Sequence, residues 1–277
     1  MSRASQPANA PVRVMGVINV TPDSFSDGGR FADLSAAILQ ARRLIADGAD
    51  LLDIGGESTR PGADAVSEAA EIDRVVPLIR AIRAESTIPI SIDTMKPAVA
   101  RAAVQAGASV WNDVTALRHA PDSLAVAAQL GCQVVLMHMR GEPRTMQSAP
   151  RYDDVTAEVC QHLSERARIA REAGVARDAI WLDPGIGFGK TAAHSLTLLG
   201  QLDRMVALGF PVLLGVSRKS FFKAVDPTAE RADDRLGGSI AAALVGARLG
   251  VAAVRVHDVR ETVQALAVQA AIEAAGS

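Results

Sequence analysis

Short apolar segments alternate with longer, helix-like segments along the whole chain. The apolar segments have the length of buried strands, and the segments between them are rich in alanine and place apolar residues at helical spacing. Eight strands are therefore predicted, at residues 12–20, 51–54, 88–92, 109–114, 134–137, 180–182, 212–216 and 251–256. Eight helices are predicted to follow them, at residues 36–48, 67–84, 98–106, 123–130, 156–173, 196–208, 238–249 and 261–275.

A strand followed by a helix, repeated eight times, is typical of an α/β fold in which helices wrap a parallel barrel, the (β/α)8 or TIM barrel. The 277 residues suffice for one such domain at 12–277, after a small, polar tail at 1–11 that we expect to be disordered. An open, doubly wound sheet is the main alternative, but it usually has a glycine-rich turn after its first strand. Here residues 19–25 read Asn-Val-Thr-Pro-Asp-Ser-Phe, which favours the barrel.

Composition narrows the range of partners. The formal net charge is -2 and aromatic residues make up 3%, so the sequence has neither the basic footprint nor the stacking residues of a nucleic-acid-binding protein. No segment approaches the roughly 20 apolar residues of a membrane span. The two cysteines, Cys132 and Cys160, lack the spacing of a disulfide framework or a zinc site. We therefore expect a cytoplasmic protein that binds neither nucleic acid nor membrane.

Polar residues end the predicted strands, and a barrel would bring these ends together at one face. Asp93, Asn112 and Asp183 end the third, fourth and sixth strands. Each alone could merely cap a loop. Together they offer the hydrogen-bonding groups that suit a flat heterocycle with an amino group and ring N–H groups. They could equally hold a metal ion or supply a general base.

Basic side chains follow the second, seventh and eighth strands, at Arg60, Lys219, Arg255 and His257. Arg255 and His257 alternate with valines, so both point into the barrel if the valines face the helices. A buried guanidinium requires a partner. Asp258 is one candidate, and a bound phosphate or pyrophosphate, which arginine grips with two hydrogen bonds, is the other.

Three loops after strands are rich in glycine. Those at residues 19–29 and 55–62 also carry many hydrogen-bonding side chains, and they are either plain connections or lids that order over a ligand. The loop at 183–191 is close to a P-loop, but Pro184 stands where the first glycine of that motif must be. Its glycines would instead let the backbone pass close to a ligand.

The fifth strand ends at His138, which could line the same face. Met137, Met139 and Met146 are near it, and their soft side chains suit contact with a flat ring, although methionine also fills ordinary cores. The other histidines have no metal-binding spacing and are expected at the surface or in helix caps: His119, His162 and His194.

The strand ends match those of one known family. From about Val12 to its last helix, the chain resembles the dihydropteroate synthases of folate biosynthesis. The resemblance rests on motifs that occur in order, one per strand end, at residues 19–29, 56–62, 91–94, 111–114, 136–139, 183–190, 217–220 and 255–258. Each motif is weak alone, but the set is specific.

The resemblance implies a transferase that condenses 6-hydroxymethyl-7,8-dihydropterin pyrophosphate with p-aminobenzoate, giving 7,8-dihydropteroate and pyrophosphate. It also implies Mg²⁺ as cofactor, sulfonamides as inhibitors and a homodimer. The pterin would be held by Asp93, Asn112, Met137, Asp183 and Lys219. Pyrophosphate would be held by Asn19, Arg60, Arg255 and His257, with Mg²⁺ reached through Asn19. The p-aminobenzoate site would be bordered by Thr59, Arg60, Pro61, Phe188, Lys219 and Ser220. The residues expected to be catalytic are Asp93, Asp183, Lys219 and Arg255.

Chemistry supports the same activity. Arginine, histidine and Mg²⁺ neutralise pyrophosphate, and the electron-rich dihydropterin stabilises a cation at its exocyclic carbon. We therefore expect SN1-like loss of pyrophosphate without a protein nucleophile. Two rivals are a pterin-dependent methyltransferase and a catalytically silent pterin-binding paralogue. The first does not need all four basic residues, and the second should lose loop or pyrophosphate residues that this chain retains.

Overall fold

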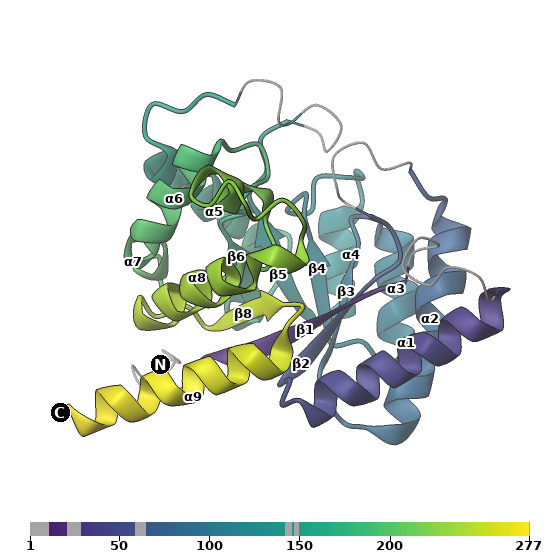
Figure 1. Cartoon of the computed structure of the whole chain (residues 1–277). Helices are drawn as coiled ribbons and strands as arrows, with labels where there is room; N and C mark the ends of the chain where they lie inside the picture. The colour runs from purple at the N-terminus through teal and green to yellow at the C-terminus, as the bar shows by residue number, and fades with distance from the viewer. Residues whose placement is uncertain (1–10, 21–28, 59–64, 142–145, 147–149, 277) are drawn as a thin grey trace.

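Eight parallel strands form one sheet that curls into a nearly closed barrel (Figure 1). They are β1 (Arg13–Asn19), β2 (Leu51–Gly55), β3 (Ile90–Asp93), β4 (Val110–Asp113), β5 (Gln133–Met137), β6 (Ile180–Asp183), β7 (Leu213–Gly215) and β8 (Ala253–Val256). Their order is β6-β5-β4-β3-β2-β1-β8-β7, and one bridge, between Leu182 and Val212, joins the two outermost strands. The predicted (β/α)8 barrel is confirmed.

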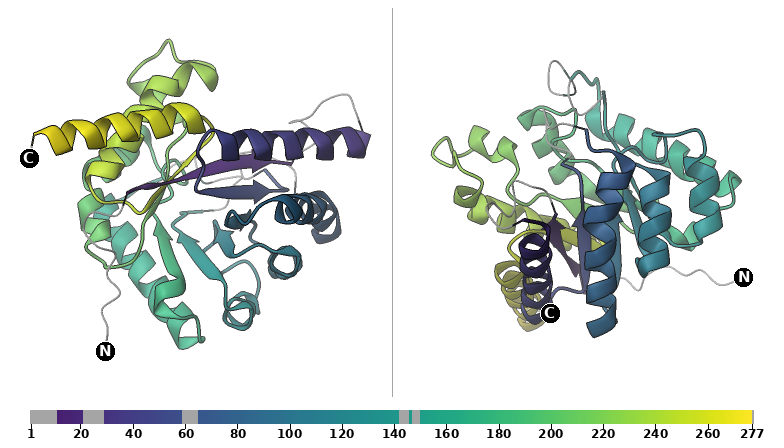
Figure 2. Two further views of the ribbon diagram at one scale, coloured as in Figure 1. Left: turned by 90° about the horizontal axis from the view of Figure 1, so that it is seen from below. Right: turned by 90° about the vertical axis from the view of Figure 1, so that its right-hand side faces the viewer.

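Helices cover the outside of the barrel (Figures 1 and 2). They are α1 (Gly29–Ala46), α2 (Glu68–Glu85), α3 (Pro97–Ala106), α4 (Ser123–Leu130), α5 (Val155–Glu172), α6 (Ala192–Gly200), α7 (Leu202–Val206), α8 (Leu236–Arg248) and α9 (Val259–Ala275). The single helix predicted at 196–208 is wrong, because α6 ends after Gly200 and Gln201 leaves the helical conformation, with φ -124° and ψ 28°. None of the helices in the described part of the chain has the length and hydrophobicity that a membrane crossing requires.

The computed structural model describes residues 11–20, 29–58, 65–141, 146 and 150–276. The predicted disordered tail lies outside these residues except for its last position. Most of the loop at 19–29 and much of the loop at 55–62 lie outside them as well.

The barrel interior is built in two layers. Met15, Leu51, Val110, Trp181 and Leu213 belong to a buried apolar cluster on the inner face of the strands. Side chains two residues apart on a strand point to the same side, so the next inward position of each strand lies above this cluster. Several of those positions are polar: Asp53, Asn112, Asp183 and Arg255. The apolar layer therefore forms a floor, and the polar layer above it faces the carboxyl ends of the strands.

A buried lysine ties β2, α2 and α3 together outside the barrel. The Lys96 ammonium donates to Glu57 Oε2 at 2.9 Å, to Glu71 Oε2 at 2.6 Å and to the carbonyl oxygen of Val66 at 2.6 Å. Glu57 Oε1 in turn accepts from the Val66 N–H at 2.9 Å. Because none of the three charged side chains is more than 9% exposed, each depends on the others for its charge partner.

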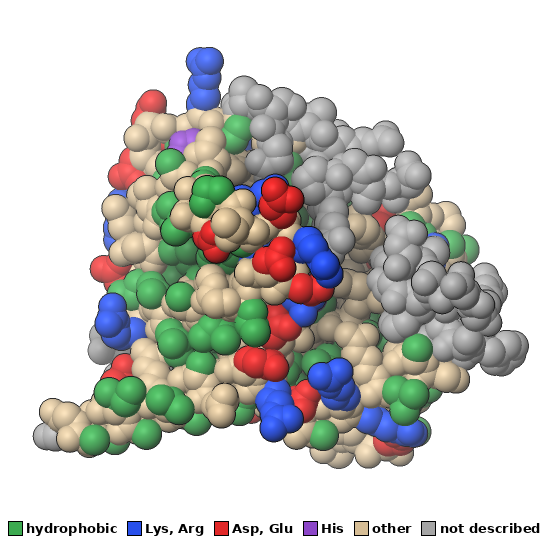
Figure 3. All heavy atoms as spheres, in the orientation of Figure 1, with side chains coloured by type: hydrophobic (Ala, Val, Ile, Leu, Met, Phe, Trp, Pro, Cys, Tyr) green, Lys and Arg blue, Asp and Glu red, His purple; other side chains and the backbone are tan. Residues whose placement is uncertain are grey.

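Two helices on the outer face leave apolar side chains uncovered. A groove runs between α8 and α9, and Figure 3 shows hydrophobic side chains gathered over both helices. Val268 and Ile272, one turn apart on α9, are 54% and 67% exposed. The groove also carries charged groups of both signs, namely Arg248, Glu261 and Glu273.

We predict that Lys96→Met lowers the free energy of unfolding by about 3 to 5 kcal/mol, because it leaves two buried carboxylates without a cation. Urea unfolding of the variant and the wild type measures this loss. Lys223→Met removes an exposed lysine and serves as the control. A loss below about 1 kcal/mol for Lys96→Met would contradict the assignment of the cluster as a structural tie.

Candidate active site

Arg255 on β8 lies at the centre of the polar layer. Its Nε donates to Asp53 Oδ2 at 2.5 Å, and its Nη2 donates to Asp93 Oδ2 at 2.8 Å. The prediction that Arg255 points inward is confirmed by these contacts with β2 and β3. The suggested partner Asp258 is wrong, since its carboxylate accepts two hydrogen bonds from Arg218 instead.

Asp53 is a site residue that the sequence analysis missed. It is fully buried, and its Oδ2 also accepts a hydrogen bond from the Asn112 side chain at 3.3 Å. It stands in the middle of the apolar run of β2 rather than at its end. The sequence could have shown this, because Asp53 is two residues after Leu51 and must therefore point to the same side of the strand.

The carboxylates around Arg255 outnumber it. Burial raises the pKa of Asp93 to about 7, with the nearby charge of Asp53 adding to the shift and Arg255 opposing it. Each of these two carboxylates gives one oxygen to Arg255. Among the described residues, the other oxygen of each is buried and has no hydrogen-bond partner. The centre of the barrel therefore presents acceptors to a ligand that brings N–H groups.

Asp183 and Lys219 lie on the neighbouring strand ends, β6 and β7. The Asp183 carboxylate is 5% exposed, and its Oδ1 accepts from the Gly185 N–H at 2.6 Å. Burial raises its pKa. Burial lowers the pKa of Lys219 to about 8, although the charge of Asp183 opposes this shift. These two opposite charges act on each other electrostatically at the same mouth.

An apolar wall flanks these charges. Met137 packs with Met139 and Met146 in a buried cluster, and the Phe188 ring packs against it. Lys219 Nζ lies 4.3 Å from the centre of the Phe188 ring. The methionines expected near β5 therefore do form one surface beside the polar residues.

Asn19 ends β1 beside Asp93. Its Oδ1 lies 3.7 Å from the point that a Cβ on Gly55 would occupy, and the Asp93 Cβ lies 3.6 Å from the same point. Asn19 thus adds a half-buried amide to the edge of the site.

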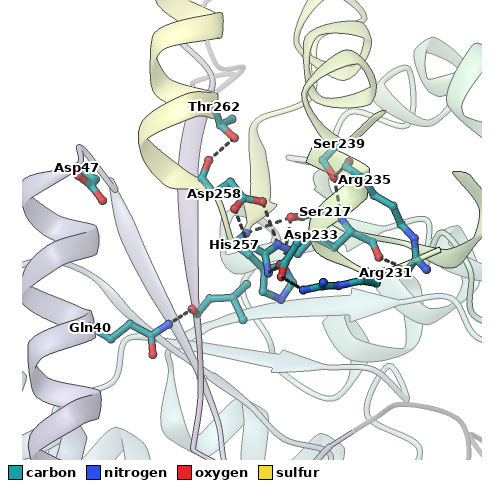
Figure 4. Close-up of polar contacts among 12 residues, drawn as sticks. Gln40, Asp47, Ser217, Arg231, Asp233, Arg235, Ser239, His257, Asp258 and Thr262 are labelled. Atoms are coloured by element: carbon teal, nitrogen blue, oxygen red, sulfur yellow. Dashed lines mark hydrogen bonds and ion pairs between the residues drawn. The ribbon is translucent and has the colours of Figure 1, made fainter. Parts of the chain in front are cut away.

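His257 and its surroundings occupy the ends of β7 and β8 (Figure 4). The Ser217 hydroxyl accepts from the His257 backbone N–H at 3.1 Å and lies 3.0 Å from its ring Nδ1. Arg218 joins Asp258 to Asp233, with its Nη1 2.6 Å from Asp233 Oδ1. These bonds fix the orientation of His257 relative to β7.

The structure describes only some of the residues predicted for the p-aminobenzoate and pyrophosphate sites. Ser220 is exposed at the start of a 3-10 turn, η3 (Ser220–Ala224). The remaining residues predicted for the p-aminobenzoate and pyrophosphate sites lie outside the described residues: Thr59, Arg60 and Pro61.

The histidine predictions need one correction. His119 is exposed and His194 closes a capping box with Thr191, as expected. His162 is neither, because its ring packs edge-on against His138 with ring centres 4.9 Å apart. Burial and then the charge of Lys190 lower the pKa of His138 to about 2, and burial lowers that of His162 to about 4. The pair is therefore neutral in the folded protein.

The chain is similar to known proteins over most of its length. The family described as pterin binding enzyme matches residues 15–257. Dihydropteroate synthase of Synechocystis sp. is 48% identical over 252 residues, which cover 91% of this chain and 86% of the relative. The structure of Xanthomonas albilineans dihydropteroate synthase with 4-aminobenzoic acid has a TM-score of 0.90 and 50% identity, covering 95% of this chain and 94% of that one. The Yersinia pestis enzyme in a sulfonamide drug complex has a TM-score of 0.89 and 42% identity, covering 95% of both chains.

We predict that His138 makes the protein less stable in acid. In the unfolded chain its pKa is near 6.5, so below that pH the unfolded state binds a proton that the folded state does not take up until about pH 2. Its contribution to the free energy of unfolding therefore falls by about 1.4 kcal/mol per pH unit as the pH drops below 6.5. Above pH 6.5 the contribution is constant.

Chemical unfolding of the wild type and His138→Asn between about pH 7 and pH 5 tests this slope. The stability of the wild type should fall more steeply than that of the variant. His119→Asn, which changes an exposed histidine, should run parallel to the wild type. Parallel curves for His138→Asn would contradict the prediction.

Proposed function

Because this chain belongs to the family of pterin-binding enzymes, we propose that it carries out the dihydropteroate synthase reaction at the mouth of its barrel. It is a transferase that joins 6-hydroxymethyl-7,8-dihydropterin pyrophosphate to p-aminobenzoate in folate biosynthesis. The observation that carries the proposal is the arrangement of buried acceptors, Asp53, Asp93 and Asp183, around Arg255 and Lys219. This arrangement suits a small, flat ligand with several N–H groups and an anionic substituent.

The pterin is held by its polar edge. Asp183 Oδ1 is occupied by the Gly185 N–H, which leaves Oδ2 to accept from the amino and ring N–H groups. Asp93 has a buried oxygen for further donors, and Asn112 is fixed beside it through Asp53. Met137 packs on the ring face. The polar edges of the heterocycle thus hydrogen-bond to fixed side chains, and its ring face packs against an apolar surface.

The reaction needs bond cleavage, cation stabilisation and attack. The bond between the exocyclic carbon and the pyrophosphate oxygen breaks, and its electron pair leaves with pyrophosphate. The amine nitrogen of p-aminobenzoate then forms the new bond to that carbon and releases a proton to water. The positive charges of Arg255 and Lys219, with hydrogen bonding from the His257 ring, stabilise the leaving charge, and the carboxylates stabilise the cationic pterin. Holding the two reactants in line supplies the rest of the rate enhancement.

The residues fit a magnesium ion bound together with pyrophosphate. Mg²⁺ prefers oxygen ligands and is usually held by one or two protein groups plus phosphates and water. The half-buried Asn19 amide ends β1 at the carboxyl ends of the strands and offers one such oxygen. The described residues hold no group of three or more acidic, histidine or cysteine side chains suited to a metal, so the ion would depend on the substrate's phosphates. When bound, it would neutralise charge on the leaving group.

We infer that Phe188, Lys219 and Ser220 border the p-aminobenzoate site. The sequence motif assigns Thr59, Arg60 and Pro61 to the same site, and these lie outside the described residues. The ring of the amine packs beside Phe188, and its carboxylate meets Lys219 and the Ser220 hydroxyl. Sulfonamides share the shape of this substrate and compete for the site. The similarity to the Yersinia pestis enzyme, which is known in a sulfonamide drug complex, supports this assignment.

A second copy of this chain covers the groove between α8 and α9. The groove is apolar at Val268 and Ile272 and carries Arg248 together with two glutamates. A twofold axis through such a patch buries the apolar side chains of both copies against each other. Exposed apolar patches of this kind mark association surfaces.

An activity assay tests the proposed reaction against its rivals. Purified protein with both substrates and Mg²⁺ should release pyrophosphate and form 7,8-dihydropteroate, and a chelator should stop turnover. A methyltransferase would release no pyrophosphate. A silent paralogue would bind the pterin without turnover, so either result would overturn the proposal.

We predict that Asp183→Asn weakens pterin binding by about 10- to 100-fold, because the amide replaces a charged acceptor and costs about 1.5 to 3 kcal/mol per lost hydrogen bond. Calorimetry with the free hydroxymethyl pterin measures this effect. Asp203→Asn, at an exposed position on α7, is the control. Unchanged affinity for Asp183→Asn would remove Asp183 from the pterin site.

We predict that the wild type is a dimer with a mass of about twice 28.9 kDa, and that the double substitution Val268→Asp/Ile272→Asp makes it monomeric. The added carboxylates would have to be buried in the contact, which is costly. Light scattering after size-exclusion chromatography gives the masses. Leu39→Asp, at an exposed apolar residue on α1, should leave the dimer intact. A monomeric wild type would rule out this surface.

A further inference from the structure

The turn between β6 and α6 packs with its backbone directly on the backbone that follows β5. Gly185 and Gly189 both have φ of +62°. A Cβ on Gly185 would overlap the carbonyl oxygen of His138, and one on Gly189 would overlap that of Arg140. The two segments can lie this close only because neither glycine has a side chain.

This close packing brings several carbonyl oxygens to one point, and Lys190 occupies it. The Lys190 ammonium donates to the carbonyl oxygens of Gly185 at 2.9 Å, Phe188 at 3.1 Å and His138 at 3.3 Å. It also lies 2.8 Å from His138 Nδ1. The side chain is 3% exposed. Converging carbonyl dipoles repel one another, so the ammonium compensates for an arrangement that would otherwise be unfavourable.

The neighbouring groups agree with this role. His138 is neutral, and its Nδ1 must accept if it bonds to an ammonium. Burial works against this charge and lowers the pKa of Lys190 to about 7, whereas the charge of Asp183 favours the ammonium. A second hydrogen bond holds the outer side of the turn, where the Tyr152 hydroxyl donates to the Gly189 carbonyl at 2.8 Å.

The turn held in this way carries Phe188 into the site. Lys190 binds the carbonyl of Phe188 itself and that of Gly185, three residues before it. The Phe188 ring stands over Lys219 and against the methionine cluster. A change in the position of these carbonyls therefore moves the ring that borders the amine-binding side of the mouth.

We propose that Lys190 is a positioning residue for the aromatic amine substrate: through the carbonyls of Gly185 and Phe188 it fixes the Phe188 ring relative to Lys219. The inference rests on the proposed function for the identity of the substrates. Lys190 touches neither substrate in this scheme, and its effect passes through Phe188. It therefore acts on the affinity for p-aminobenzoate more than on the affinity for the pterin. Asp183, which binds the pterin, is held by its place in β6 as well as by the Gly185 N–H.

Steady-state kinetics with each substrate varied in turn test the proposal, using the wild type, Lys190→Met, Phe188→Ala and the double variant. Lys190→Met should raise the KM for p-aminobenzoate by about 10-fold or more, while the KM for the pterin pyrophosphate changes by less than about twofold. In the Phe188→Ala background, Lys190→Met should raise the KM for p-aminobenzoate by less than about threefold, because the residue it acts through is already gone.

Two controls separate positioning from general stability. Lys223→Met removes an exposed lysine and should leave both KM values unchanged. Tyr152→Phe removes a tie of the same turn on its outer side and should have a smaller effect than Lys190→Met. If Lys190→Met does not fold, Lys190→Arg replaces it, since the larger guanidinium keeps the charge but cannot reproduce the geometry; it should raise the KM for p-aminobenzoate selectively.

The outcomes are distinct. Equal increases in both KM values, no increase at all, or effects that multiply fully in the double variant would overturn the role of Lys190 while leaving the proposed function intact. A wild type without turnover of the two substrates would overturn the proposed function, and the inference with it.

Discussion

A guanidinium inside a barrel must be paired, and Arg255 meets this requirement with Asp53 and Asp93. The pairing has consequences for the whole site. Two carboxylates for one cation leave an excess of negative charge and two buried acceptor oxygens in the interior. The same acceptors that stabilise Arg255 therefore define what kind of ligand the barrel can hold. The ion pairs that satisfy a buried charge of the fold therefore also shape the proposed ligand site.

The barrel and most of its polar mouth could be predicted from sequence because parallel strands all end at the same face. Asp93, Asn112 and Asp183 each close an apolar run, and the structure places them together above the floor of the barrel. The inward direction of Arg255 followed from its alternation with valines. These inferences need only the alternation of side chains along a strand and the direction in which the strand runs. Both can be read from a short stretch of sequence.

What the sequence did not reveal depends on pairing across the fold. Asp53 stands within an apolar run, and only the strand register places it beside Arg255. Lys96 and Lys190 each lie close to a strand end or a glycine-rich turn, yet their partners come from other elements. The sequence suggests Asp258 as a partner of Arg255 because the two are close in sequence. In the structure it pairs with Arg218 instead. Charge pairing is a property of three-dimensional contacts.

The barrel closes between β6 and β7, and this closure has a consequence for substrate binding. Seven neighbouring strand pairs share backbone ladders, but Leu182 and Val212 form the single bridge between the ends of the sheet. Asp183 ends β6 and Lys219 follows β7, so the two stand on opposite sides of this closure. A pterin held by both would add a link across the pair of strands that is joined by a single bridge. Bound substrate would then reinforce the barrel where its strands share the fewest backbone pairs.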